Sequence, residues 1–367
     1  MKIKFNREAL QDALGLITSV VPARTPKPIL QCLRITSEAD AVTVCATDLE
    51  VGINIQVLQV EIDEPGDIVL PADKLASIVR ESSDEVVELE ESESTISIKG
   101  ADSHFTIYGH DISQFPTVPG IVDKGELEIS LARLQKGIEM SVFAAAKEST
   151  RYALNGILWE VDDSKLNIVA TDGRRLAKSV VELDSSATGK IPEGKIIVPT
   201  KAMTLLDRVG GPEDAVVGIR FIDNQIVLSC GQVVISSNLL DGSFPKYEDI
   251  IPEDYDNRVV MPTTAALSAV RRASLLANED SKGIKLSLTG DKIVFSSRAP
   301  ETGDAQINMA VDYKGKPIDI GFNPQFLIDV LRVIKEDEFV LEVGDSERPG
   351  VIKSGNDFIY IVMPVNL

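Results

Sequence analysis

The feature that most constrains this sequence is a pattern that recurs about every 125 residues. Helix-like segments that follow a strand and a turn start near residues 69, 197 and 320, at offsets of 128 and 123. Ala-Thr-Asp begins at Ala46 and Ala170, 124 residues apart, and Phe-Pro begins at Phe115 and Phe244, 129 residues apart. Self-similarity at one spacing predicts copies of one structural unit. Coincidence among common strand–turn–helix units is the alternative, and three marks that share one period weigh against it.

Each block of this pattern reads as two helices and many strands. A first helix is expected over 6–20, 130–147 and 262–276, and a second over 69–80, 197–210 and 320–335. Between them lie alternating or β-branched runs bounded by turn residues, which is typical of strands. Proline-rich joints at 115–120 and 244–252 fit domain boundaries. We therefore expect an α+β chain of three repeated domains, over residues 1–123, 124–252 and 253–367.

The stretch 129–155 shows how charge is arranged on these helices. At helical spacing an apolar stripe forms on one side; its members are Leu131, Leu134, Ile138, Val142 and Ala145. Arg133, Lys136 and Lys147 gather on the other side, and Arg151 joins them if the helix extends that far. A basic helix face is usually only solvated, and this alternative stays open for one helix taken alone.

Charge separates by element along the whole chain. The net charge is −20, from 37 basic and 57 acidic residues, which taken alone argues against nucleic-acid binding. Yet the six helical segments together carry +6, which leaves −26 for the remainder of the chain. Helices gathered on one surface would form a positive stripe on a negative body. Such a stripe suits a phosphate backbone without base reading and predicts steep salt dependence.

No catalytic constellation can be assembled from the sequence, and we expect no metal or cofactor. His104 and His110 flank a strand-like segment and are interpreted as surface residues. Asp48 and Asp172 could hold Mg²⁺ as a pair. They occupy equivalent places in different repeats, however, so we expect them to be far apart and to act as turn residues. An acidic enzyme that uses these aspartates is the alternative from another class, and a scaffold without a DNA role is a third.

The cysteines and the hydropathy indicate the compartment. Cys32, Cys45 and Cys230 form no CxxC pair and no zinc spacing, so we interpret them as reduced core residues of a cytoplasmic protein. No apolar run approaches the length needed to span a bilayer, and residues 1–10 lack the apolar core of a secretory signal.

Several motifs resemble one known family over the whole length. They are RTPKPIL at 24–30, ATDLEV at 46–51, RYALNGI at 151–157, VATDGRRLA at 169–177, DGSFPKY at 241–247, NED followed by KGIKL at 278–286, and YIVMPVNL at 360–367. In this order and spacing the sequence resembles the bacterial DNA polymerase III β subunit family, the sliding clamps. The resemblance implies clamp domains with two helices packed on antiparallel sheets, and a head-to-tail homodimeric ring around duplex DNA. It implies an accessory of the polymerase rather than an enzyme.

The resemblance also implies partners and DNA-contacting residues. Implied partners are the polymerase III α subunit, the clamp loader, other polymerases, ligase and mismatch-repair proteins. By position in the family's motifs, the DNA contacts are Arg24, Arg151, Tyr152, Lys201, Arg271, Arg272 and Lys282. The charge arguments alone add Arg80, Arg133, Lys136 and Lys147.

A groove for short linear peptides is implied between the second and third domains. It maps onto Leu154, Thr171, Gly173, Arg174, Arg175, Leu176, Pro245, Ile250, Asn323, Phe326, Ile361, Met363, Pro364 and Val365. Aliphatic and proline side chains at loop and terminal positions can form an exposed apolar site for a disordered segment. Asp249 and Asn366 depart from the basic residues that many members carry, so the peptide preference is left open.

The implied dimer contact joins the first domain's edge strand to the third domain. Phe105 is expected against Leu275 and Leu276, with Arg298 and Glu301 beside them. Asp102 and His104 stand where many members have arginines, which leaves the charged part of this contact open.

Overall fold

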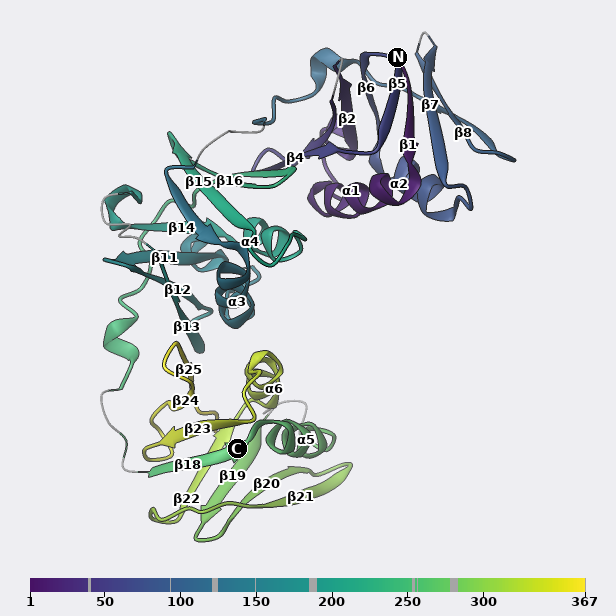
Figure 1. Ribbon diagram of the computed structural model, residues 1–367. Helices are drawn as coiled ribbons and strands as arrows, with labels where there is room; N and C mark the ends of the chain where they lie inside the picture. The colour runs from purple at the N-terminus through teal and green to yellow at the C-terminus, as the bar shows by residue number, and fades with distance from the viewer. Residues whose placement is uncertain are drawn as a thin grey trace. The chain divides into compact units, whose positions relative to one another are not determined.

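A computed structural model describes residues 1–38, 41–92, 94–120, 125–148, 150–184, 190–252, 255, 257–277 and 283–366 (Figure 1). The chain divides into two compact units. The first contains Met1–Ala132 and Lys201–Leu239, and the second contains Arg133–Thr200 and Leu240–Leu367. No helix in the described ranges is long and apolar enough to cross a membrane.

The first unit contains the whole first repeat and half of the second. Its strands are β1 (Lys2–Asn6), β2 (Cys32–Ser37), β3 (Val42–Thr47), β4 (Val51–Val57), β5 (Val60–Glu64), β6 (Gly66–Pro71), β7 (Val86–Ser92), β8 (Thr95–Lys99), β9 (His104–Tyr108), β10 (Leu127–Ser130), β15 (Val216–Ile222), β16 (Gln225–Cys230) and β17 (Val233–Asn238). Its helices are α1 (Arg7–Val20), α2 (Ala72–Glu81) and α4 (Thr200–Asp207), with short 3₁₀ helices at Pro28–Gln31 and Ile112–Gln114.

Two antiparallel sheets organise this unit. One has the strand order β5-β1-β7-β8-β9, and the other β10-β15-β16-β17-β4-β3-β2-β6. Helix α1 begins where the Asn6 side chain accepts a hydrogen bond from the Ala9 amide at 3.1 Å. Its buried stripe, Leu10, Leu14 and Ile17 among others, packs on α2 and on β3 and β4. Figure 1 shows α1 and α2 side by side.

The second unit contains the other half of the second repeat and the whole third repeat. Its strands are β11 (Gly156–Asp162), β12 (Lys165–Thr171), β13 (Arg175–Glu182), β14 (Lys195–Pro199), β18 (Asn257–Pro262), β19 (Ile284–Thr289), β20 (Lys292–Ala299), β21 (Gly303–Ala310), β22 (Ile318–Phe322), β23 (Glu338–Val343), β24 (Gly350–Ser354) and β25 (Phe358–Val362). Its helices are α3 (Leu131–Val142), α5 (Thr263–Ser274) and α6 (Pro324–Val333), with 3₁₀ helices at Tyr152–Asn155, Pro192–Gly194 and Glu248–Ile250.

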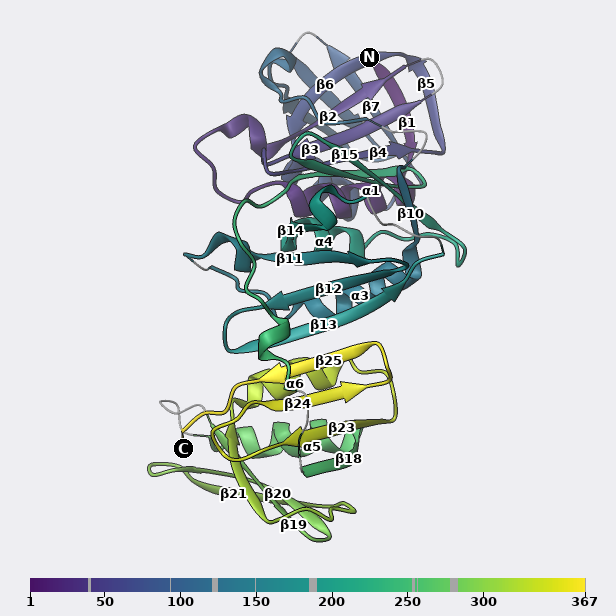
Figure 2. The same ribbon diagram turned by 90° about the vertical axis from the view of Figure 1, so that its left-hand side faces the viewer.

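The sheets of this unit are also antiparallel. Their strand orders are β14-β11-β12-β13-β25-β24-β23-β18 and β21-β20-β19-β22, and Figure 2 shows β25, β24 and β23 lying in sequence in the first of them. Helix α6 begins at Asn323, whose side chain accepts a hydrogen bond from the Gln325 amide at 2.9 Å. The α+β class with antiparallel sheets is therefore confirmed.

Strand pairs join one repeat to the next within each unit. In the first unit β17 pairs with β4, and Ile235 lies opposite Ile53. In the second unit β25 pairs with β13, and Tyr360 lies opposite Ala177. Both large sheets therefore run through a repeat boundary, which explains why three sequence repeats pack as two compact units.

Helix α3 is shorter than the sequence pattern predicted. It ends at Val142, and the Ala144 and Ala145 amides turn back to the carbonyls of Ser141 and Val142. The next amide, of Ala146, donates to the carbonyl of Leu154 at 3.0 Å, so it is not available to continue the helix. Lys147 and Arg151 consequently follow the helix instead of extending its basic face.

Candidate nucleic-acid interface and peptide groove

The predicted DNA-contacting cations of the first unit lie on or beside its helices. Arg80 is in the last turn of α2, where a cation is favoured by the helix dipole, and its side chain is 65% exposed. Lys201 opens α4, but its ammonium donates to the carbonyl of Val20 at 2.8 Å and pairs with Asp48. Lys201 is therefore held inside the unit more firmly than a solvated phosphate-binding lysine would be.

A further cation in this unit was not singled out from the sequence. Arg208 follows α4 and donates from Nη2 to the carbonyl of Gly15 at 3.0 Å. Arg80 and Arg208 line one depression of about 600 Å³ between α1, α2 and the end of α4. The signal was available, because residue 208 belongs to the helical segment whose net charge is positive.

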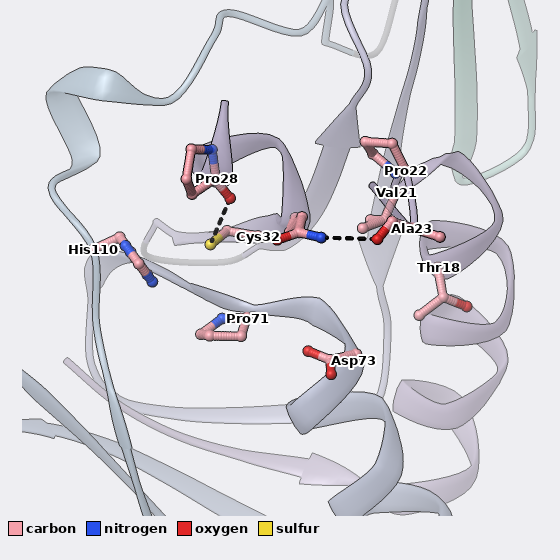
Figure 3. Close-up of a pocket in the computed structure, with 10 residues that line it drawn as sticks. Thr18, Val21, Pro22, Ala23, Pro28, Cys32, Pro71, Asp73 and His110 are labelled. Atoms are coloured by element: carbon pink, nitrogen blue, oxygen red, sulfur yellow. Dashed lines mark hydrogen bonds between the residues drawn. The ribbon is translucent and has the colours of Figure 1, made fainter. Parts of the chain in front are cut away.

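The loop that carries Arg24 is anchored near one end. The carbonyl of Ala23 accepts a hydrogen bond from Nε2 of Gln31 at 3.1 Å, which fixes the loop against the 3₁₀ helix at Pro28–Gln31. This loop borders a cavity of about 430 Å³, which Pro28, Pro71 and His110 line on other sides (Figure 3). Arg24 itself is exposed.

In the second unit the predicted cations of α3 face acidic groups. Arg133 donates to Oδ1 of Asp184 at 2.7 Å, and Lys136 lies 3.8 Å from Oε1 of Glu336. Both cationic side chains are more than half exposed. Exposed ion pairs of this kind contribute little stability and exchange readily with another anion.

The remaining predicted DNA contacts are exposed or lie outside the described residues. Arg271 and Arg272 occupy the last turn of α5. Lys147, Arg151 and Tyr152 lie between α3 and β11, and Tyr152 is 74% exposed. Lys282 lies outside the described residues.

The predicted groove residues divide into a buried base and an exposed rim. Leu154, Leu176 and Ile361 are at most 5% exposed, and Leu176 lies opposite Ile361 across the β13–β25 pair. The rim consists of Gly173, Arg174, Ile250 and Met363; Ile250 is 40% exposed and Met363 39%. Met363 is tied to the rim by its amide, which donates to the carbonyl of Arg174 at 2.9 Å.

The other predicted groove residues hold these parts together. Asn323 caps α6, and Val365 donates its amide to the carbonyl of Gly321 at 2.9 Å. Pro245 precedes Tyr247, which is buried and donates its hydroxyl to Glu160 at 2.5 Å. Burial, followed by that hydrogen bond, raises the pKa of Tyr247. Pro364 is half-buried beside Met363.

Arg175 is the buried charge of this region and belongs to its base. Its Nε donates to Asp172 at 3.0 Å, Nη1 to Asp329 at 2.7 Å and Nη2 to the carbonyl of Phe143 at 2.8 Å. Its guanidinium also lies 4.5 Å from the ring centroid of Phe326. Burial acts to lower the pKa of Arg175, but the hydrogen bond to Asp329 and the interactions with Tyr360 and Asp172 together outweigh it, and the pKa is raised. Arg175 thus stays cationic and positions β13 against α6.

The two aspartates of the repeated Ala-Thr-Asp motif act as turn residues. Oδ1 of Asp48 accepts the amides of Glu50 at 2.9 Å and Val51 at 2.7 Å. Oδ1 of Asp172 accepts the amides of Arg174 at 2.9 Å and Arg175 at 3.1 Å. The second oxygen of each is engaged by a cation, Lys201 or Arg175. These contacts support the turn interpretation and leave the Mg²⁺ alternative without an observation in its favour.

The residues predicted at the dimer contact lie on two sheet edges and one helix end. Phe105 is 43% exposed on β9, at the edge of its sheet. Leu275 is 79% exposed and Leu276 half-buried, just after α5. Arg298 and Glu301 are exposed where β20 turns into the edge strand β21.

Comparisons with known proteins agree with this architecture. The sequence matches the DNA polymerase III beta subunit N-terminal domain over residues 1–119, the central domain over 128–246 and the C-terminal domain over 248–366. The beta sliding clamp of Pseudomonas aeruginosa is 32% identical over 370 residues, with both chains covered completely.

Solved structures give the same result. The crystal structure of the P. aeruginosa sliding clamp bound to griselimycin is similar with a TM-score of 0.90 and 32% identity over the whole of both chains. The crystal structure of the Bacillus subtilis clamp has a TM-score of 0.90 and 29% identity, covering all of this chain and 99% of that one.

Proposed function

The chain belongs to the DNA polymerase III beta subunit family, the bacterial sliding clamps, and from that premise we propose how its residues perform this function. As a sliding clamp it is a processivity factor without a catalytic site of its own. It binds duplex DNA and the polymerase, and it acts as a homodimer. We propose a cytoplasmic location and three clamp domains over residues 1–123, 124–252 and 253–367.

The ring proposal depends on two strands, β9 and β21, that lie at sheet edges although their equivalents in the other repeats pair with each other. The strands that join repeats are β17 with β4 and β25 with β13. By order within each repeat, β9 corresponds to β17 and β25, and β21 corresponds to β4 and β13. Strands β9 and β21 are both at sheet edges. Since exposed edges invite pairing, β9 of one copy is proposed to pair with β21 of another.

The internal junctions also predict which position of β9 is central. Just after β9, β17 and β25, one backbone amide of each repeat donates to the strand that leads into the second helix. The donors are His110, Leu240 and Val365, and the acceptors are the carbonyls of Val69, Ile197 and Gly321. Each acceptor lies three residues before the first residue of its helix, α2, α4 or α6. These amides are therefore equivalent. Counting back five residues from each leads to Phe105, Ile235 and Tyr360. Phe105 thus takes the place that Ile235 and Tyr360 take at the internal junctions.

The partner position on β21 follows in the same way. Ile53 and Ala177 lie opposite Ala46 and Ala170 of the repeated motif. In the first repeat Ile35 lies between Val44 and Ile68 across the sheet, and in the third repeat Leu286 lies in the same way between Phe295 and Ile320. Phe295 is therefore equivalent to Val44. Two residues further along each strand, Ser297 is equivalent to Ala46. Ser297 lies opposite Ala305. Phe105 is therefore proposed opposite Ala305 of the partner subunit.

In a dimer closed in this way, we propose that the helices of all repeats face the DNA. The exposed cations on or beside the helices are proposed to line the hole and to contact DNA phosphates; they are Arg24, Arg80, Arg133, Lys136, Lys147, Arg151, Arg208, Arg271 and Arg272. Tyr152 and Lys201 are proposed to contribute as well, and so is Lys282, which lies outside the described residues. Exposed, weakly paired cations can exchange phosphate contacts and so allow sliding without base recognition.

The predicted groove is proposed to recruit partners. Its rim residues Ile250 and Met363 offer exposed apolar area, and Met363 is bonded through its amide to the carbonyl of the cation Arg174. This combination suits a short peptide with aliphatic anchors and an acidic residue. Peptides of the polymerase α subunit, the clamp loader and other polymerases are proposed to share it with those of ligase and mismatch-repair proteins. Griselimycin, with which the P. aeruginosa clamp was crystallised, is proposed to bind this chain as well.

Topological retention on DNA tests the function. The protein is loaded by a clamp loader onto nicked circular plasmid, separated from free protein on a sizing column, and the plasmid is then cut once. A clamp stays with the circle and runs off the linear product. Retention that survives cutting would indicate ordinary contact binding instead, and the encircling ring would be rejected.

A further inference from the structure

A cavity of about 310 Å³ lies at the junction of the first two repeats, within the first unit. It is lined by the β3–β4 turn, by the proline-rich segment 116–119 and by β17. We call it the first-junction cavity. This cavity is equivalent in position to the predicted peptide groove. The β3–β4 turn and β17 line the cavity, and the corresponding β12–β13 turn and β25 border the groove.

The two turns are built in the same way. Thr47 Oγ1 donates to the Val51 carbonyl at 2.9 Å and accepts the Leu49 amide at 2.9 Å. At the second junction Thr171 Oγ1 donates to the Arg175 carbonyl at 2.6 Å and accepts the Gly173 amide at 3.1 Å. Asp48 and Asp172 also match, because Oδ1 of each accepts hydrogen bonds from the amides two and three residues further along the chain.

The next repeat holds both turns through equivalent bonds. The Asn238 amide donates to the Glu50 carbonyl at 2.9 Å, as the Met363 amide does to the carbonyl of Arg174. Asn238 adds a side-chain bond to the carbonyl of Leu49 at 3.2 Å. The first-junction turn is therefore held in place before any ligand binds, and preorganisation lowers the entropic cost of binding.

Three differences between the repeats give the first-junction cavity its own chemistry. Leu49 stands where the second repeat has Gly173, and both residues have positive φ, 79° and 88°. A leucine in this left-handed conformation is strained by roughly 1–2 kcal/mol, yet its side chain is 46% exposed rather than used in the core. Leu49 thus offers apolar area at the mouth of the cavity.

A glycine allows close packing at the base of the cavity. Gly52 stands where the second repeat has Leu176, and a Cβ added at Gly52 would lie 2.8 Å from Oγ of Ser236 and 3.0 Å from Val118. The missing side chain lets Val118 and Ser236 approach the backbone. Walls of Leu49, Val118 and prolines, with serine hydroxyls at the base, suit one aliphatic side chain with a hydrogen-bonding backbone.

The charge at the rim is reversed relative to the peptide groove. Glu50 occupies the position of Arg174, is exposed, and is the one charged side chain among the described lining residues. Its carboxylate has no ion-pair partner in the described part of the chain, whereas many other acids of this unit are paired. The cavity therefore favours a cationic ligand where the groove favours an anionic one.

We propose that the first-junction cavity is a second peptide-docking site, for a short segment that carries a lysine or arginine beside an aliphatic residue. A clamp partner could then be held at two points on one subunit, by an acidic motif in the groove and a basic motif here. Two linked weak contacts raise overall affinity without a new strong one. The inference rests on the proposed peptide binding at the groove for its analogy, and it is tested separately from it.

The test uses the full-length protein and two fluorescein-labelled pentapeptides, Lys-Leu-Ser-Leu-Lys and Glu-Leu-Ser-Leu-Glu, followed by fluorescence anisotropy at 0.15 M salt. The Glu50→Lys variant is expected to weaken binding of the basic peptide at least tenfold and to leave the acidic peptide unchanged. The Arg174→Glu variant is expected to do the reverse. Glu213→Lys, which alters the same charge at an exposed position in a loop of the first unit, is the matched control.

The outcomes separate the two sites. If Glu50→Lys and Glu213→Lys weaken the basic peptide equally, the binding reflects the acidic surface in general and the inference is overturned, as it is if the basic peptide does not bind. If the acidic peptide loses affinity in no variant, the proposed groove fails while the first-junction site can still stand. A Leu49→Gly variant, expected to lower basic-peptide affinity several-fold, checks the apolar part independently of charge.

Discussion

Asp329 of α6 accepts a hydrogen bond of 2.7 Å from Nη1 of Arg175 on β13, so a buried ion pair spans 154 residues of sequence and joins the second repeat to the third. The Arg175 side chain is 9% exposed and that of Asp329 20%. Removal of one partner of such a pair leaves an uncompensated charge, which is more costly than the pair itself is stabilising.

We therefore expect Arg175→Ala to lower the free energy of unfolding by about 3 kcal/mol, measured by urea denaturation. Arg174→Ala, next to it but exposed, is the control and is expected to change stability by less than about 0.5 kcal/mol. Equal effects of the two variants would contradict the structural role assigned to Arg175.

DNA binding should reveal the cations of the first unit through its salt dependence. Each of Arg80→Ala and Arg208→Ala is expected to reduce the slope of log Kobs against log salt by about 0.9, because each removes roughly one phosphate contact. The measurement is titration of a short duplex between 50 and 200 mM salt. Arg258→Ala, on strand β18 and exposed, should leave the slope unchanged. An unchanged slope in both test variants would remove these arginines from the proposed interface.

The groove rim should control partner binding without affecting DNA. Ile250→Asp is expected to weaken binding of the polymerase α subunit by tenfold to a hundredfold, since burial of an aliphatic side chain stabilises by roughly 1.5–3 kcal/mol. Surface plasmon resonance measures this, and retention on nicked plasmid should remain normal. Val260→Asp, at an exposed aliphatic position on β18, is the control. A comparable loss in the control would show that the added charge, not the groove, is responsible.

The buried thiols predict a pH dependence. Burial raises the pKa of Cys32 and of Cys45 to about 11. Because the pKa of each thiol is higher in the folded than in the unfolded protein, the neutral thiol adds to the free energy of unfolding. This contribution is complete below pH 9 and is lost as the pH rises through 11. Between pH 8 and 10.5 wild type should thus lose about 2 kcal/mol more stability per thiol than Cys32→Ala or Cys45→Ala does. Identical losses in urea denaturation would contradict the assignment.

Sequence periodicity predicted the repeats because each copy must bury its own stripe of apolar residues. The helix expected over 6–20 is α1, Arg7–Val20, and the one over 262–276 is α5, Thr263–Ser274. The third boundary of this kind was wrong: α3 ends at Val142 because the Ala146 amide pairs with Leu154. The end of α3 is set by this contact with a later segment, and the spacing of apolar residues within a helix cannot predict such a contact.

The same limit applies to the site residues. The family resemblance placed Arg175 among the groove residues, but its partners Asp329 and Phe143 come from other elements, which makes it a buried positioning residue. Lys201 was predicted as a DNA contact from its position, and its bonds to Asp48 and Val20 could not be inferred from charge pattern alone. Turn chemistry was predictable, because Oδ1 of each turn aspartate accepts hydrogen bonds from amides only two and three residues further along the chain.

The dimer junction gives the sharpest prediction, because the internal junctions specify its register. If Phe105 lies opposite Ala305 of the partner subunit, the Cα atoms of this pair are about 4.5–5.5 Å apart, which a disulfide can bridge. The double variant Phe105→Cys/Ala305→Cys should form two crosslinks that close the ring and should resist dissociation by denaturant without reductant. The three native cysteines are buried and do not compete. Phe105→Cys/Gln306→Cys is the matched control, because a shift of one residue turns the second side chain to the opposite face of the sheet. Efficient crosslinking of the control, with none in the test pair, would show that the outer junction does not copy the inner ones.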